Sequence, residues 1–170
     1  MKRMMKFLLA AGLVVAFIGC KINYSFTGAS ISPDVKTYSI LDFPNRAKLV
    51  NPNLSNYFVE KLREKFTRQT SLNYLDEGGD LEFEGTISQY DVQPVSIKAG
   101  TDEASMNRLT IKISVKFTNR KNSEQDFESE FSAYADFDSS QLLSDVEDNL
   151  IEQIIKEIID DIYNKSVANW

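Results

Sequence analysis

The chain has no histidine and only one cysteine among its 170 residues. Without imidazole it cannot build the Ser-His-Asp or Cys-His pairs that activate common nucleophiles. It also lacks the nitrogen ligand that zinc sites use beside cysteine. A single cysteine excludes a disulfide within the chain. These shortages remove the commonest hydrolase and zinc-site chemistries.

Motifs for phosphate and calcium are missing as well. Gly78-Gly79 is not followed by the Lys and Ser/Thr of a phosphate-binding loop. Asp76, Glu77 and Asp80 lie close together, but they lack the alternating oxygen ligands of an EF-hand, so a solvated acidic turn is the simpler interpretation. No set of nucleophile, base and orienting partner can be assembled. The sequence therefore predicts a protein that is not an enzyme and holds no metal or cofactor.

The first twenty residues have the pattern of a secretory signal. Three basic residues within the first six positions precede an apolar run at residues 7–18, and Gly19-Cys20 follow. The run is shorter than the roughly 20 residues that a membrane-spanning helix needs. We therefore expect this segment to be removed after export.

A cysteine at the cleavage boundary is typical of lipoproteins, because its sulfur receives a diacylglyceryl group before the peptide is cut. Residues 17–20, Phe-Ile-Gly-Cys, resemble a lipobox, with Phe17 in place of the usual leucine. We expect cleavage between Gly19 and Cys20 and covalent diacylglyceryl and acyl lipid on Cys20. The alternative is a free cysteine buried beside an apolar helix. That alternative leaves the charge and length pattern unexplained.

Three segments are predicted: a signal peptide at 1–19, a lipidated tether at 20–34 and a single domain at 35–170. Of the 19 basic residues three lie in the signal peptide, so 16 remain against 25 acidic residues, a net charge of −9. This balance argues against general nucleic-acid binding, which depends on neutralising phosphates.

The first half of the domain predicts a strand and then a helix. Residues 35–43 are rich in β-formers and end at Pro44-Asn45. Asn51-Pro52 supply a cap and a first helical residue. An apolar residue then recurs at every fourth position, at Leu54, Phe58, Leu62 and Phe66.

Three strands and a long helix are predicted to follow. Residues 81–88 alternate apolar and polar, with a bulge near Gln89-Tyr90 and a break at Pro94. Residues 109–118 alternate without a fault, residues 120–123 form a turn, and residues 127–137 form the last strand. Ser144 and Glu147 have capping-box spacing before a helix at 145–165 with a wide apolar stripe.

The predicted fold is α+β, a two-layer sandwich in the order β-α-β-β-β-α. The apolar stripes of the two helices and the apolar face of a four-stranded sheet are all buried when both helices cover that face. The opposite face would then be polar and mixed in charge, with Glu82, Glu84, Thr86, Lys112, Ser114, Lys116, Glu128, Glu130, Ser132 and Tyr134.

Basic residues gather on and around the third predicted strand, at Lys98, Arg108, Lys112, Lys116, Arg120 and Lys121. They could form a positive patch that contacts lipopolysaccharide or a partner, and Arg108, Lys112 and Lys116 are the candidate contacts. The simpler interpretation, which we favour, is that strand lysines keep the sheet soluble and discourage edge pairing.

Several stretches together resemble the LptE family of lipopolysaccharide-assembly lipoproteins, in particular its Bacteroidetes branch. They are distributed along essentially the whole mature chain, at residues 20–31, 43–47, 49–52, 79–85, 107–111, 116–119 and 168–170. The resemblance implies a plug inside the lumen of an LptD-type outer-membrane β-barrel, where the two proteins deliver lipopolysaccharide to the outer leaflet. It also implies help with barrel assembly, and it makes lipopolysaccharide a candidate ligand. It assigns a role to Cys20 alone.

The alternative is a free periplasmic lipoprotein that carries lipid or another anionic ligand. A carrier is expected to offer an open apolar cavity, whereas a plug needs a polar surface against a polar barrel interior. The residues after Cys20, at 21–25, include no acidic residue. We therefore expect a lipid anchor in the outer membrane and a domain that faces the periplasm and the barrel lumen.

Overall fold

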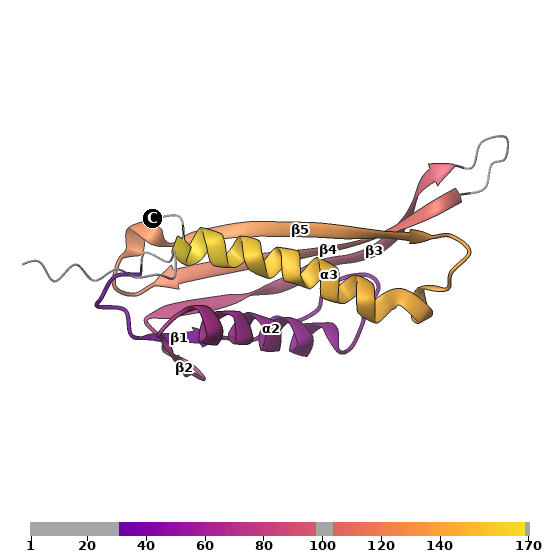
Figure 1. The fold of residues 1–170 in the computed structure, drawn as a ribbon. Coiled ribbons are helices and arrows are strands. Elements are labelled where there is room, and N and C mark those ends of the chain that lie inside the picture. Colours follow the sequence, from indigo (N-terminus) through magenta and orange to yellow (C-terminus); the bar gives the residue numbers. More distant parts are fainter. Residues whose placement is uncertain (1–30, 98–103, 169–170) are drawn as a thin grey trace, which may run out of the picture.

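The computed structural model describes residues 31–97 and 104–168. In this part of the chain a mixed sheet forms one layer and two long helices form the other (Figure 1). The strands are β1 (Thr37–Ile40), β2 (Asn73–Leu75), β3 (Leu81–Ile97), β4 (Ala104–Asn119) and β5 (Phe127–Asp138). The helices are α2 (Leu54–Gln69) and α3 (Leu143–Tyr163), with short turns η1 (Ser123–Gln125) and η2 (Asn164–Ala168). The α+β class is confirmed.

The sheet has five strands in the order β2-β1-β3-β4-β5, so the predicted count of four is wrong. β1 is parallel to both of its neighbours, whereas β3, β4 and β5 form an antiparallel meander. The unpredicted strand is β2, which has only three residues and places Tyr74 opposite Tyr38. No apolar run marks β2, because its single half-buried residue lies between two exposed ones.

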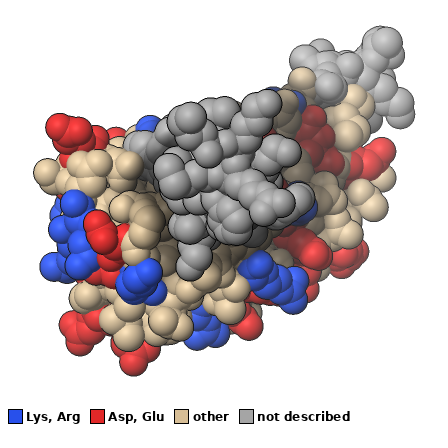
Figure 2. All heavy atoms as spheres, turned by 60° about the vertical axis from the view of Figure 1, so that its left-hand side comes forward, with Lys and Arg blue, Asp and Glu red and all other residues tan. Residues whose placement is uncertain are grey.

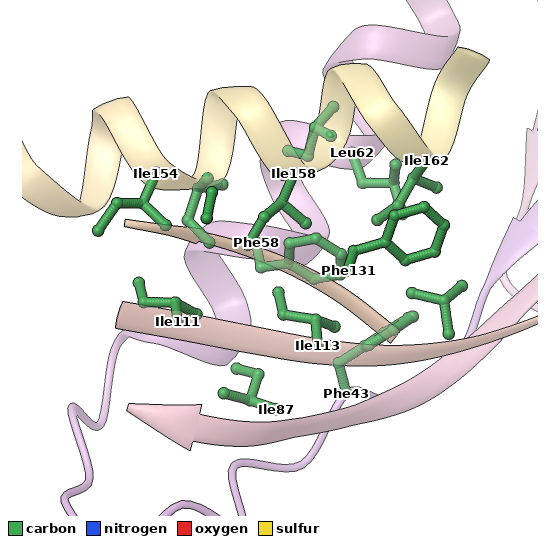
Figure 3. Close-up of a cluster of buried hydrophobic side chains, with 14 of the residues drawn as sticks. Phe43, Phe58, Leu62, Ile87, Ile111, Ile113, Phe131, Ile154, Ile158 and Ile162 are labelled. Atoms are coloured by element: carbon green, nitrogen blue, oxygen red, sulfur yellow. The ribbon is translucent and has the colours of Figure 1, made fainter. Parts of the chain in front are cut away.

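Both helices cover the same face of the sheet, as predicted. α2 buries its four periodic residues, Leu54, Phe58, Leu62 and Phe66. Figure 3 shows Ile154 and Ile158 of α3 lying above Ile111 and Ile113 of β4. All four isoleucines have no exposed surface.

Phe66 joins the two helices to the sheet. Its ring centroid lies 4.9 Å from that of Phe83 on β3 and 5.3 Å from that of Tyr163 on α3. Such tilted and edge contacts stabilise beyond the area they bury, by about 0.5–1.5 kcal/mol each. One aromatic residue of α2 therefore fixes the positions of three elements.

Both helix starts differ from the prediction. α2 begins at Leu54, and the side-chain oxygen of Asn51 instead accepts a hydrogen bond from the Asn53 N–H at 2.9 Å. α3 begins at Leu143, which places Ser144 inside the helix, so the capping box does not form. The Glu147 carboxylate instead accepts a hydrogen bond from the Tyr90 hydroxyl of β3. A contact with the sheet has replaced a local cap.

The strands also extend differently. β1 covers only Thr37–Ile40 of the nine residues predicted. The irregularity after Ile87 is confirmed as a register shift between β3 and β4. Pro94 does not end β3, which continues to Ile97 with a further shift beside the proline. Proline has no N–H to donate, so a strand tolerates it where no neighbouring strand needs that hydrogen bond.

The turn between β4 and β5 is longer than the four residues predicted. It includes η1, and its backbone is held by side chains. The Asp126 carboxylate accepts from the Asn119 N–H at 2.7 Å, and the Asn119 side chain accepts from the Lys121 N–H at 2.9 Å.

The predicted signal peptide and most of the tether lie outside the described residues. The expected cleavage site between Gly19 and Cys20 therefore lies outside them as well.

Candidate functional site

The polar face of the β3-β4-β5 meander is the candidate site. Side chains alternate between the two faces of a strand. The apolar residues of β4, Leu109, Ile111, Ile113, Val115 and Phe117, are fully buried under the helices. Their alternate neighbours lie on the other face, which no described helix or strand covers. At the β1 end of the molecule, which Figure 2 brings forward, acidic and basic side chains are also interspersed where the described surface is visible.

The charges on this face form stripes that follow the strands. β4 contributes basic residues, Arg108, Lys112 and Lys116, and both neighbouring strands contribute carboxylates. Lys116 lies directly opposite Glu84 of β3 and binds it at 2.5 Å. Lys112 binds Glu130 of β5 at 3.1 Å. From β3 to β5, the face therefore carries an acidic, a basic and a second acidic stripe.

Arg108 is the most constrained cation of the face. Its guanidinium donates to both oxygens of Asp136, at 2.7 and 2.9 Å, and lies 3.6 Å from the centroid of the Tyr134 ring. The hydrogen bond from Arg108 lowers the pKa of the Asp136 carboxyl. Planar guanidinium groups suit bidentate pairing and aromatic stacking together.

A second group of charges fastens one end of the sheet. The Asp80 carboxylate accepts from the backbone N–H groups of Lys36 and Thr37, at 2.8 and 3.1 Å, and pairs with Lys121 at 3.0 Å. Arg120 binds the carboxylate of Glu82 at 3.0 Å. Asp80 therefore joins β1, β3 and the β4-β5 turn, which is a structural role.

The three predicted contact residues are brought together on one strand and one face. Each is paired with a carboxylate, at Glu84, Glu130 or Asp136, so none presents an isolated positive charge. Their role as contacts stays a prediction. Sequence reasoning placed two of these acidic residues on the polar face but missed the pairing, because the pairing depends on strand register.

A hollow of about 310 Å³ lies on the opposite layer, between α2 and α3. Its walls include Lys65 and Lys156, which share Asp160 at 2.7 and 3.0 Å, and Lys61 and Arg68, which share Glu64. The apolar floor includes Ile155 and Ile159. The charges in this hollow are largely balanced, as they are on the sheet.

Within residues 31–97 and 104–168 no cluster of three metal-ligating side chains occurs. Neither helix of that part is both long and apolar enough to cross a membrane. All the buried side-chain nitrogen and oxygen atoms described there have a hydrogen-bond partner.

Comparison with solved structures shows a shared fold. A hypothetical protein, CT253, from Chlamydia trachomatis is 10% identical over 79% of this chain and 99% of its own, with a TM-score of 0.54. A minor lipoprotein from Acinetobacter baumannii is 11% identical over 77% of this chain and 91% of its own, with a TM-score of 0.50. No curated protein was found to match the chain.

A family model described as lipopolysaccharide assembly matches residues 35–166, from just before β1 to the end of α3 and into η2. The match spans both helices and the whole meander that carries the polar face. The chain therefore belongs to the LptE family of lipopolysaccharide-assembly proteins.

Proposed function

We propose that this protein is a non-enzymatic lipoprotein subunit of the outer-membrane lipopolysaccharide translocon. It plugs an LptD-type β-barrel, assists the assembly of that barrel and so serves lipopolysaccharide transport to the outer leaflet. Family membership supports the role in lipopolysaccharide assembly. The observation that carries the plug is the polar sheet face, which no helix or strand of residues 31–97 and 104–168 covers and which lies opposite a filled core.

The chemistry of that face suits a barrel lumen. Large outer-membrane barrels have polar interiors. Burying an unpaired charge is expensive, whereas a charge that keeps its partner and hydrogen bonds is tolerated at an interface. Arg108, Lys112 and Lys116 each bring a partner of their own. We therefore propose them as barrel contacts ahead of lipopolysaccharide contacts.

The alternative is a free carrier of lipid or of another anionic ligand. Such a carrier needs an apolar cavity large enough to shield acyl chains. The space between the layers is filled here, since Phe58, Ile154 and Ile158 have no exposed surface. Purification in mild detergent separates the two functions: a plug brings a stoichiometric barrel, and a carrier is a monomer loaded with lipid.

Lipid on Cys20 would hold the domain at the outer membrane. We propose that Cys20 carries diacylglyceryl and acyl chains, and that the domain faces the periplasm and the barrel lumen. The absence of acidic residues at 21–25 supports this orientation. Protease added to intact cells should leave the protein whole, and ready digestion would contradict the orientation.

A charge exchange on the sheet tests the plug directly. The triple variant Lys116→Glu with Glu84→Lys and Glu128→Lys keeps attractive pairs on both sides of β4, because Glu84 on β3 and Glu128 on β5 both lie directly opposite Lys116. It reverses the charges that a barrel wall would meet. We expect the melting temperature to stay close to that of the unchanged protein and the recovery of co-purified barrel to fall severalfold.

The matched control is the same exchange on the helical layer. Lys61→Glu with Glu64→Lys and Arg68→Glu reverses the two ion pairs that Glu64 makes on α2, at 3.1 and 2.6 Å, and keeps both of them attractive. We expect this control to leave both melting temperature and barrel recovery unchanged. Equal recovery from the two exchanges would contradict a role for the sheet face, and absence of any barrel from the unchanged protein would contradict the partnership itself.

A further inference from the structure

The outer edge of β5 differs from the other sheet edges in the described part of the chain. At the opposite side, β2 has only three residues, and the β3 edge beyond β1 is interrupted by Pro94 and register shifts. Short strands, prolines and bulges are the usual protection against unwanted strand pairing. β5 has none of these: its twelve residues pair with β4 in one unbroken register and include no proline, glycine, lysine or arginine.

The backbone groups that β5 directs outward can be identified from the ladder. The Ser139 N–H donates to the Ser105 carbonyl at 3.3 Å, in continuation of the register that places Met106 opposite Asp138. Opposite residues alternate between hydrogen-bonded and non-bonded pairs in an antiparallel ladder. The odd-numbered residues of β5 therefore bond to β4, and the even-numbered residues from 128 to 136 direct their N–H and C=O outward.

The other end of the sheet gives the same assignment. The Arg120 N–H donates to the Asp80 carbonyl at 2.8 Å, so even-numbered residues at this end of β4 bond to β3. Odd-numbered residues such as Phe117 then bond to β5, where Phe127 is the partner. The outward residues of β5 are all exposed, and they are Glu128, Glu130, Ser132, Tyr134 and Asp136.

The charge of this edge selects what can pair with it. Its charged side chains are all carboxylates, at Glu128, Glu130 and Asp136. Pairing of β5 with a second copy of β5 would bring acidic rows together, and like charges directly opposite are destabilising. The stripes run acidic, basic, acidic from β3 to β5, so a basic strand is the neighbour that would continue the alternation.

We propose that the outer edge of β5 binds an extended segment of a partner polypeptide in which basic side chains alternate with small or apolar ones. The segment adds a strand to the sheet: its backbone bonds to the outward groups of residues 128–136, and its cations meet the carboxylates of β5. Backbone bonds supply affinity in this mode of recognition, and side-chain alternation supplies specificity. The proposal does not depend on the barrel partnership.

A synthetic peptide tests the edge on the purified full-length protein in detergent. The probe is a fluorescein-labelled nine-residue peptide that alternates lysine with threonine, and binding is followed by fluorescence anisotropy. The key variant is Ser132→Pro, which removes an outward N–H while every N–H bonded to β4 remains. We expect at least tenfold weaker binding to Ser132→Pro and unchanged binding to the matched control Ser132→Ala.

Two altered peptides make the test independent of how the proline variant folds. Methylation of alternate backbone nitrogens removes hydrogen bonds and keeps the charge, and replacement of lysine by glutamate keeps the backbone and reverses the charge. We expect both changes to weaken binding at least tenfold. Binding of the methylated peptide as tightly as the parent would mean simple charge attraction and would overturn the proposal. So would failure of the parent to bind, or a β5-paired dimer that excludes it.

Discussion

Arg108 on β4 and Asp136 on β5 lie directly opposite each other and are joined by two hydrogen bonds, of 2.7 and 2.9 Å. Tyr134, two residues before Asp136, supports the guanidinium with its ring. A residue that the sequence offered as a candidate contact for lipopolysaccharide or a partner is thus held by two neighbours on the next strand. The same change of interpretation applies to Lys112 and Lys116.

This arrangement predicts that replacing Arg108 by lysine lowers the thermal stability of the domain. Arg108→Lys keeps the charge but loses the bidentate geometry and the stacking on Tyr134. We expect the melting temperature to fall by no more than about 3 °C, because the pair is partly exposed. Lys116→Arg is the control, since Lys116 makes a single hydrogen bond to its partner and should show no loss. Equal behaviour of the two variants would mean that the bidentate geometry contributes nothing.

Asp80 should make the stability of the domain depend on pH. Its pKa is lowered from 3.8 to about 2, first because the Lys36 N–H donates to it, and further because Lys121 and Thr37 donate as well. A lowered folded-state pKa stabilises the fold fully above the unfolded value near pH 4, and this contribution is lost as the pH falls through about 2. Asp80→Asn should lower the free energy of unfolding at pH 7 by about 2 kcal/mol.

Urea denaturation at several pH values measures this effect. The difference between Asp80→Asn and the unchanged protein should shrink between pH 4 and pH 2. Asp76→Asn, at an exposed position in the same loop, is the control and should change little. A difference that stays constant down to pH 2 would show that ionisation of Asp80 does not cause the stabilisation.

Gly85 on β3 should not accept a side chain. A methyl group there would lie against the Ser114 carbonyl oxygen of β4 and 2.6 Å from a ring carbon of Phe43. We expect Gly85→Ala to lower the free energy of unfolding by about 1–3 kcal/mol. Gly78 is the control: its φ is +74° and a Cβ at that position would have nothing within 4 Å, so Gly78→Asn should be tolerated. Thermal melting compares the two, and a stable Gly85→Ala would mean that β3 and β4 can move apart locally.

The apolar stripe of α3 should not accept a charge. Ile155 is 1% exposed beneath the helix. Ile155→Asp buries a carboxylate without a partner and should lower the free energy of unfolding by more than about 3 kcal/mol, with degradation in cells. Gln153→Asp, two residues earlier on the exposed side, should leave the protein intact. Circular dichroism and the level of protein in cells give the comparison, and equal stability of the two variants would refute the burial of this side of α3.

Cys20 should be the site of lipidation. Cys20→Ser removes the thiol that receives the diacylglyceryl group, so labelling with radioactive palmitate should be lost. Either uncleaved precursor or a poorly anchored product should accumulate. Undiminished label in the variant would contradict the lipoprotein assignment and the membrane localisation that depends on it.

Periodicity in the sequence was sufficient for both helices and for the regular part of β4, but not for the full length of β3. The fourfold spacing from Leu54 to Phe66 predicts α2, and the strict alternation at residues 109–118 predicts most of β4 and its two faces. These signals are local. A helix or strand that packs one side against an apolar core carries apolar residues at the repeat of its own geometry. The same repeats predict that both helices share one face of the sheet and leave a polar face opposite.

The tertiary structure decided what no local repeat contains. β2 is a strand only because β1 lies beside it, and Glu147 binds Tyr90 only because α3 crosses the sheet at that point. The pairing of Arg108 with Asp136 and the exposure of the β5 edge depend on register and strand order. Register is set by contacts between segments far apart in the chain, and a slip of one residue would turn every side chain to the other face. Composition and periodicity therefore determined which residues face water, and only the folded chain determined which of them are already paired.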